Sequence, residues 1–215
     1  MAAKRSTAAK ETAELEGRET EILTAAARAF MIRGYAATSL DEVAEILGCT
    51  KGLIYYHFKS KADLFFAIHR YSMERAFAFV APVAREKTPP SVRLRQMAFN
   101  HAWLIITENE FQRVSVLGLQ MHVSGSTTAR QRQLIRELTA LRDRYEAIFA
   151  SLIEEGIRIG ELRKCNARLV TKPFLGALNW LALWYRRRSG ESDDDRRALA
   201  NEMADYVMNG LQPVA

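Results

Sequence analysis

The chain has 215 residues, of which 48% are hydrophobic and 26% charged. This composition is typical of folded globular proteins and excludes disordered and collagen-like chains. The 31 Lys and Arg residues outnumber the 25 Asp and Glu residues, which permits a polyanionic partner without identifying one.

Residues 1–16 are polar and rich in charge, and we expect them to form a flexible N-terminal arm. The same stretch lacks the apolar centre of a secretion signal, and no later window holds about 18 consecutive apolar residues. Two distant cysteines, Cys49 and Cys165, offer neither a disulfide framework nor a CxxC motif. These features predict a cytoplasmic protein without a membrane partner.

Beyond the arm, the hydrophobic periodicity is helical almost throughout, which predicts an all-α protein of about nine helices. A first helix is expected over 18–33, ending at Gly34. Ser39, followed three residues later by Glu, is a capping box that predicts a short helix ending at Gly48. Thr50 can cap a third helix over 51–57.

Six further apolar stripes at helical spacing follow in the second part of the chain. The predicted helices are 61–82, 92–107, 109–122, 129–155, 166–188 and 193–210. The segment EKTPPS at 86–91 is the clearest breaker, and Pro173 predicts a kink or a late start of the helix that contains it. We expect residues 64–215 to form one helical bundle.

Two short helices joined by a tight turn at Gly48-Cys49-Thr50 are the pattern of a helix-turn-helix. The segment TKGLIYYHFKSK, from Thr50 to Lys61, holds three lysines and no acid. The chemistry suits DNA: hydroxyl groups and a close backbone for phosphates, and Lys, Leu, Tyr and His side chains for base edges. The predicted phosphate contacts are Thr50, Gly52 and Tyr55, and the predicted base contacts are Lys51, Leu53, Tyr56 and His57. The alternative is that these aromatic residues are half-buried and the lysines merely solvated.

The sequence TSLDEVAEILGCTKGLIYYHFKSKADL, from Thr38 to Leu64, resembles the TetR family of bacterial transcriptional regulators. The resemblance implies a homodimer with a DNA-binding domain at 17–63 and a ligand-binding, dimerising domain at 64–215. Residues that match DNA-contacting positions of the family are Thr38, Ser39, Thr50, Lys51, Gly52, Tyr55, Tyr56, His57 and Lys61. Asp41 stands where many members place a basic or polar residue. It would repel phosphate unless it accepts from a cytosine amino group or is paired within the fold.

Most of the excess positive charge lies outside the helix-turn-helix. Residues 17–70 contain seven Lys and Arg against six Asp and Glu, whereas residues 71–215 contain 21 against 16. The arginines at 130, 132 and 136 form either a solvated helix surface or a site for an anionic ligand.

For an effector, the second half offers apolar helix faces with a few polar groups, the usual lining of a small-molecule cavity. The candidate ligand residues are Trp103, Phe111, Arg113, Leu117, Met121, His122, Tyr145, Phe149, Asn179 and Trp180. Side chains at this spacing also suit an ordinary helical core.

The stretch LGALNWLALWYRRRSGES, 175–192, resembles the C-terminal region of TetR-type regulators of fatty-acid and sterol side-chain catabolism, whose effectors are often acyl-CoA thioesters. Their N-W-x-x-x-W-Y-R-P pattern is matched from Asn179 to Arg186, and Arg187 stands in place of the proline. Apolar ridges on the last two predicted helices also predict a homodimer seam. Its candidate residues are Leu178, Trp184, Met203 and Val207.

The sequence therefore predicts a repressor that a small, mainly apolar effector releases from a palindromic double-stranded DNA operator. The alternatives are a helical interaction protein without a DNA role and a helical enzyme. The chain has no GxSxG, HExxH or phosphate-cradling glycine loop. We expect no enzymatic activity, no cofactor and no metal site.

Overall fold

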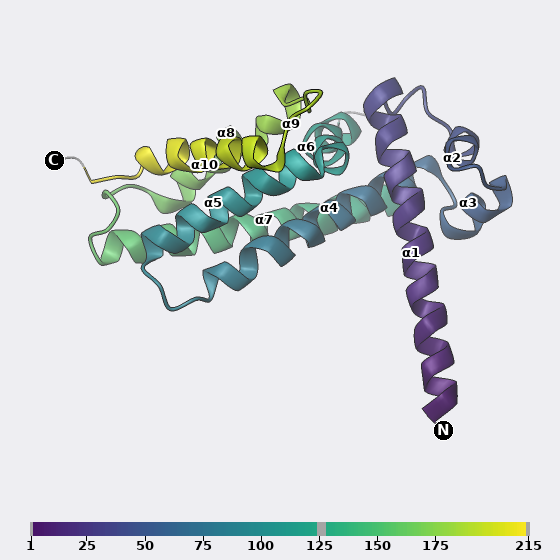
Figure 1. The fold of residues 1–215 in the computed structure, drawn as a ribbon, viewed down its shortest axis with the longest axis horizontal. Coiled ribbons are helices and arrows are strands. Elements are labelled where there is room, and N and C mark those ends of the chain that lie inside the picture. The colour runs from purple at the N-terminus through teal and green to yellow at the C-terminus, as the bar shows by residue number, and fades with distance from the viewer. Residues whose placement is uncertain (1, 124–127, 214–215) are drawn as a thin grey trace. The chain divides into compact units, whose positions relative to one another are not determined.

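The computed structural model describes residues 2–123 and 128–213, with side chains for 17–116 and 128–213, and the prediction of an all-α protein is confirmed. The helices of this described part are α1 (Ala2–Arg33), α2 (Leu40–Leu47), α3 (Lys51–His57), α4 (Lys61–Ala84), α5 (Pro90–Thr107), α6 (Asn109–Val123), α7 (Ala129–Arg158), α8 (Ala167–Asn179), α9 (Leu181–Trp184) and α10 (Asp193–Asn209) (Figure 1). Because α9 is a single turn directly after α8, these segments correspond to the nine predicted helices.

The helices form two compact units, Met1–Arg70 and Tyr71–Ala215. The boundary between them falls inside α4, so this helix contributes residues to both. No helix in the described ranges is both long enough and apolar enough to cross a membrane.

In the first unit, α1, α2, α3 and the start of α4 bury their apolar faces against one another. Ile22, Ile54 and Phe65, from three different helices, are at most 1% exposed. The ring of Phe65 lies 6.4 Å from that of Phe30 and 5.4 Å from that of Tyr35. Burial of these large side chains is the main source of stability for so small a unit.

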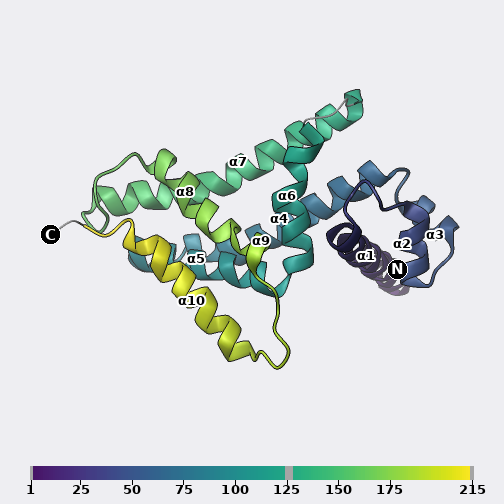
Figure 2. The same cartoon turned by 90° about the horizontal axis from the view of Figure 1, so that it is seen from above.

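In the second unit, α5 packs against α7 and α10, while α8 packs against the same two helices (Figure 2). Leu94 and Met97 of α5 and Phe149 of α7 are fully buried in the shared core. A Cβ atom added to Gly156 would lie 2.7 Å from Cδ1 of Leu162. Glycine therefore lets the chain fold back closely against the end of α7.

Several helix boundaries differ from the prediction, among them the end of α4, which continues past Pro82 to Ala84. Helix α1 begins at Ala2 instead of near Arg18, because residues 2–16 contain many good helix formers and no proline. Helix α5 begins at Pro90, since proline suits the first helical turn. The predicted helix 166–188 ends as α9 at Trp184. The next residue, Tyr185, is extended and buried, and its hydroxyl donates to Glu191.

Candidate nucleic-acid interface and effector region

Helix α2 is fixed at both ends by local hydrogen bonds. The Ser39 hydroxyl accepts from the Glu42 backbone N–H, and the Glu42 carboxylate accepts from the Ser39 backbone N–H, which confirms the predicted capping box. The hydrogen bonds from Ser39 lower the pKa of Glu42. Gly48 ends the helix with a φ of +65°, a conformation that favours glycine. These caps set the turn that leads into α3.

The outer face of α3 carries large exposed side chains although the helix has only seven residues. Tyr55 is 46% exposed and Tyr56 is 70% exposed, whereas Ile54 is fully buried. Leu53 and His57 are partly buried, and the ring of His57 lies edge-on to that of Tyr56 at 5.2 Å. The two tyrosines are thus accessible to a partner that approaches from solvent.

The start of α3 is open. Thr50 is exposed at the N-cap, where its side chain makes no capping hydrogen bond. At Gly52 an added Cβ would meet only Oγ1 of Thr50, at 3.9 Å. The backbone can therefore be approached closely at this point, as the sequence predicted for a phosphate contact.

Asp41 is paired within the fold, which answers the question raised by its position in the motif. Its Oδ2 atom accepts from Nζ of Lys51 at 2.7 Å. This hydrogen bond is the largest cause that raises the pKa of Lys51. The pair joins the first turn of α2 to the first residue of α3.

Two residues assigned to DNA by resemblance are engaged in the fold. Thr38 is buried, and its hydroxyl donates to the carbonyl of Gly34 at 2.9 Å. Lys61 is partly buried, not exposed, and its ammonium donates to the carbonyls of Tyr35 and Ala36 at 2.8 and 3.0 Å. The same ammonium lies 4.6 Å from the centre of the Tyr35 ring. Both side chains hold the segment that leads from α1 into α2.

Lys59 is a residue that the sequence reasoning did not single out. Its ammonium donates to the carbonyls of Tyr55 and Tyr56 at the end of α3, at 2.8 and 3.4 Å. With Ser39, Tyr55 and Lys61 it lines a shallow surface hollow beside α3. Its place as a lysine just after a helix end was the available signal, because such side chains often bind the last helical carbonyls.

Three of the candidate ligand residues meet around His101 in the core of the second unit. The Tyr145 hydroxyl is 2.8 Å from Nδ1 of His101, and Oδ1 of Asn179 is 3.0 Å from Nε2. Because the Asn179 oxygen only accepts, Nε2 carries the proton and the Tyr145 hydroxyl donates to Nδ1. Phe149 packs edge-on against His101 at 6.4 Å. Sequence reasoning placed these residues near a ligand, but it did not connect them through His101.

Burial decides the protonation of this cluster. Loss of hydration lowers the pKa of His101 to about 4, and the hydrogen bond to Asn179 opposes that shift. Burial also raises the pKa of Tyr145. Both groups are therefore neutral at pH 7 and satisfy each other's hydrogen bonds.

The other candidate ligand residues are dispersed. Phe111 is buried against Tyr71, with ring centres 4.9 Å apart. Arg113 is partly buried, and burial, followed by repulsion from Arg186, lowers its pKa. The guanidinium of Arg197 lies over the Trp103 ring, 4.6 Å from the ring centre. The candidate residues Leu117, Met121 and His122 lie outside the residues whose side chains are described.

An apolar hollow lies on the outer face of α8, α9 and α10. It is lined by Gly176, Ala177, Trp180, Trp184, Met203 and Tyr206. Trp180 is 60% exposed and Trp184 is 47% exposed. The structure thus groups Trp180 with two of the predicted dimer residues. Leu178 and Val207, by contrast, are buried within the chain's own core.

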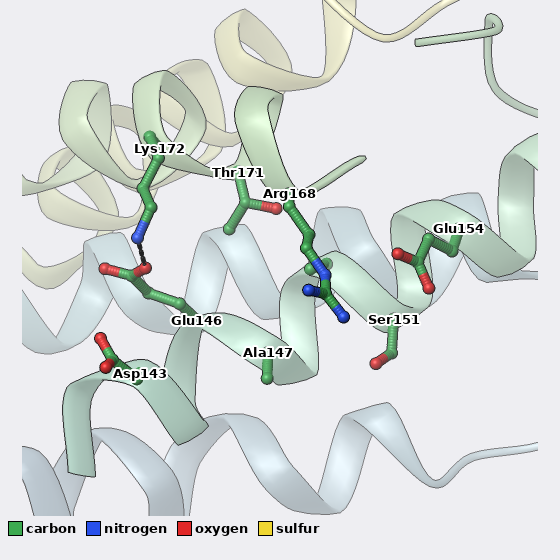
Figure 3. Close-up of a pocket in the computed structure, with 9 residues that line it drawn as sticks. Asp143, Glu146, Ala147, Ser151, Glu154, Arg168, Thr171 and Lys172 are labelled. Carbon is green, nitrogen blue, oxygen red and sulfur yellow. Dashed lines mark hydrogen bonds and ion pairs between the residues drawn. The ribbon is translucent and has the colours of Figure 1, made fainter. Parts of the chain in front are cut away.

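A second groove, between α7 and α8, is lined by charges of both signs (Figure 3). Lys172 of α8 pairs with Glu146 of α7, and Arg168 extends over the surface towards Ser151 and Glu154. The Thr171 hydroxyl already donates a hydrogen bond to the carbonyl of Ala167. Opposite charges that offset one another favour no single class of ligand here. Among the described residues, no group of three or more His, Cys, Asp or Glu could hold a metal ion.

A capped helix-turn-helix in one unit and a larger helical unit with an exposed apolar face define a DNA-binding transcriptional regulator. The family model described as "Bacterial regulatory proteins, tetR family" matches residues 22–68, and "Tetracyclin repressor-like, C-terminal domain" matches residues 87–211. The chain therefore belongs to the TetR family of non-enzymatic transcriptional regulators.

Similar proteins cover nearly the whole chain. The transcriptional repressor KstR2 of Rhodococcus jostii is 24% identical over 204 residues, which are 94% of this chain and 95% of the relative. The crystal structure of PfmR from Thermus thermophilus gives a TM-score of 0.74 at 26% identity, over 87% of this chain and 97% of that one. AibR, crystallised with isovaleryl coenzyme A and operator DNA, gives 0.72 at 23% identity, over 92% and 100%.

Proposed function

We propose that this protein is a repressor that binds a palindromic operator as a homodimer and is released by a small, mainly apolar effector. The observation that carries the DNA step is the outer face of α3. There Tyr55 and Tyr56 are exposed beside Lys51, in a helix whose Ile54 is fully buried. Exposed phenols and an ammonium on one short helix suit phosphate oxygens and base edges.

Each residue of the interface has a proposed role. Phosphate oxygens would be bound by Ser39, Thr50, Tyr55 and the backbone at Gly52, while Lys51, Leu53, Tyr56 and His57 would face the bases. Thr38 and Lys61 would act by positioning, because their polar atoms already bind backbone carbonyls. One such helix covers only a few base pairs, so selective binding calls for two copies.

The homodimer would form through the hollow lined by Trp180, Trp184 and Met203. Exposed tryptophans grouped on one face are costly to leave in water and are frequent at protein interfaces. An interface of this kind is self-complementary in a two-fold dimer, which matches the symmetry of a palindromic operator.

For the effector, an acyl-CoA thioester is the first candidate. AibR, whose fold this chain shares, was crystallised with such a thioester. Burial, followed by the nearby charge of Arg186, lowers the pKa of Arg113, so two arginines of the second unit lie near one another and would favour the anionic end of this ligand class. The apolar part would lie among helix faces of the same unit.

Helix α4 is the proposed link between effector and DNA. Leu64 and Phe65 are buried in the first unit, while Phe77, three turns on, contacts Tyr145 edge-on at 5.2 Å in the second. A ligand that favours one position of the far end of α4 would bias the start of α4, where the Phe65 ring packs against the rings of Phe30 and Tyr35. Lowering operator affinity a hundredfold in this way takes about 2.8 kcal/mol of coupling.

The test begins with selection of a duplex from a random pool, followed by affinity measurements over a range of salt concentrations. Selective, salt-dependent binding is expected, and a chain that binds no duplex, or binds without a salt slope, would overturn the DNA step. Acyl-CoA thioesters of increasing chain length are then added to the preformed complex. Release by at least one chain length is expected. Release only by an uncharged aromatic or a cationic compound would overturn the thioester assignment.

A further inference from the structure

Lys51 differs from the other two lysines of the segment 50–61 in the kind of group that holds its ammonium. Lys59 and Lys61 donate to backbone carbonyls, which are neutral. Lys51 donates to the carboxylate of Asp41 at 2.7 Å. An ammonium that is hydrogen-bonded to neutral carbonyls still attracts a polyanion with its full positive charge. When the ammonium is hydrogen-bonded to a carboxylate, the adjacent negative charge offsets that attraction.

The Asp41 carboxylate is held in place on α2. Its Oδ2 atom accepts from Lys51, while Oδ1 is covered by surrounding atoms and has no hydrogen-bond partner. The Lys51 side chain remains 60% exposed. An ammonium has three N–H donors, so two of them remain for an acceptor that approaches from solvent.

The nature of that acceptor matters because Asp41 stays beside it. A phosphate group that binds Lys51 brings a second negative charge close to the Asp41 carboxylate, and the two repel each other. The O6 and N7 atoms of guanine are neutral acceptors that a lysine in the major groove can bind together. Only the phosphate is penalised by Asp41.

We propose that Asp41 is a specificity-determining positioning residue, which disfavours contacts of Lys51 with backbone phosphates and thereby favours contacts of Lys51 with neutral acceptors on guanine. This inference rests on the proposed DNA interface at α3. According to this inference, Asp41 weakens sequence-independent binding, and Lys51 confers a preference for guanine at one base pair. Neither effect follows from the total charge of the motif.

The chain supplies a matched control. Glu45, on the same helix, is exposed and raises the pKa of Lys51 only through charge, without a hydrogen bond to it. Asp41→Asn and Glu45→Gln therefore remove the same unit of negative charge, but only the first releases the Lys51 ammonium. Lys51→Met removes the ammonium itself and keeps much of the apolar stem.

The experiment measures dissociation constants for the selected duplex and for a scrambled duplex of equal length, from low to moderate salt. Asp41→Asn is expected to tighten binding to the scrambled duplex about threefold to tenfold at low salt and to steepen the slope of log K against log salt by about 0.9. Its ratio of selected to scrambled affinity falls. Glu45→Gln produces a clearly smaller change in slope. Lys51→Met weakens the guanine preference at one base pair. In the double variant that combines Lys51→Met with Asp41→Asn, the slope of log K against log salt is no steeper than in Lys51→Met alone.

Two results would overturn the inference. If the wild type binds selectively but Asp41→Asn and Glu45→Gln change the slope equally, Asp41 acts only through overall charge. If Asp41→Asn weakens binding to both duplexes without steepening the slope, Asp41 has a structural role. The thermal melting midpoint of the variant will then show whether the fold is lost. A wild type that selects no duplex would instead overturn the proposed function, and this inference with it.

Discussion

In the first unit, the residues expected to bind DNA lie within one short segment, and two of them, Tyr55 and Tyr56, are exposed on one helix. In the second unit, the residues expected to bind a ligand do not lie together. Some form a buried polar cluster around His101, others occupy separate positions, and Trp180 is exposed just before α9. The difference reflects how each property is encoded. A helix-turn-helix is set by local caps and turns, whereas a cavity depends on which helices meet.

The largest expected effect concerns the buried cluster of the second unit. Because the pKa of His101 is lowered in the folded state, its stabilising contribution is present above the unfolded pKa, near 6.5, and is lost as the pH falls towards 4. The loss amounts to about 3 kcal/mol at pH 4. Denaturant unfolding followed by tryptophan fluorescence measures it, since Trp103, Trp180 and Trp184 all belong to this unit.

The control is His101→Gln, which keeps a neutral polar side chain and cannot be protonated. This variant is less stable at pH 7, and its stability changes less between pH 7 and pH 4 than that of the wild type. Equal pH dependence of the two proteins would show that His101 does not control the acid sensitivity.

The second prediction concerns the apolar hollow. Trp180→Arg places a charge in the proposed dimer seam and is expected to yield monomers in light scattering and to lower affinity for the selected duplex at least about a hundredfold. The matched control is Val92→Arg, at an apolar side chain of α5 that is 54% exposed and lies outside the hollow. A dimeric Trp180→Arg protein with full DNA affinity would place the seam elsewhere.

The third prediction separates positioning from contact in the first unit. Lys61→Met removes two hydrogen bonds to carbonyls and the contact with the Tyr35 ring, so unfolding should become easier by about 1 kcal/mol. DNA affinity should fall as well, because the segment between α1 and α2 loosens. If melting is unchanged while affinity drops and the salt slope falls by about one unit, Lys61 binds phosphate directly.

The smallest effect is expected for Tyr55→Phe. Loss of one hydroxyl that contacts phosphate should weaken both selected and scrambled duplexes about threefold to tenfold, without a change in melting. Ser151→Ala provides the comparison, because it also removes one hydroxyl, from an exposed residue of α7 that has no assigned DNA contact. Similar losses in the two variants would argue against a direct role of Tyr55.

The sequence alone determined the helical class, the helix-turn-helix and the limits of α2 and α3. Ser39, Glu42 and Gly48 specify the limits of α2 through interactions within a few residues of one another, so their effect can be recognised without knowing the rest of the fold. It also marked Lys51 and Tyr55 as exposed polar residues on one helix.

Only the tertiary structure decided which of these side chains are already occupied. Lys61 lies 26 positions from its acceptor Tyr35, and His101 lies 44 and 78 positions from Tyr145 and Asn179. Asp41 and Lys51 are ten positions apart on different helices, so their pairing depends on the angle of the turn. Hydrogen bonds of this kind form where packing of the apolar core brings helices together. Local sequence patterns do not predict which helices pack against one another.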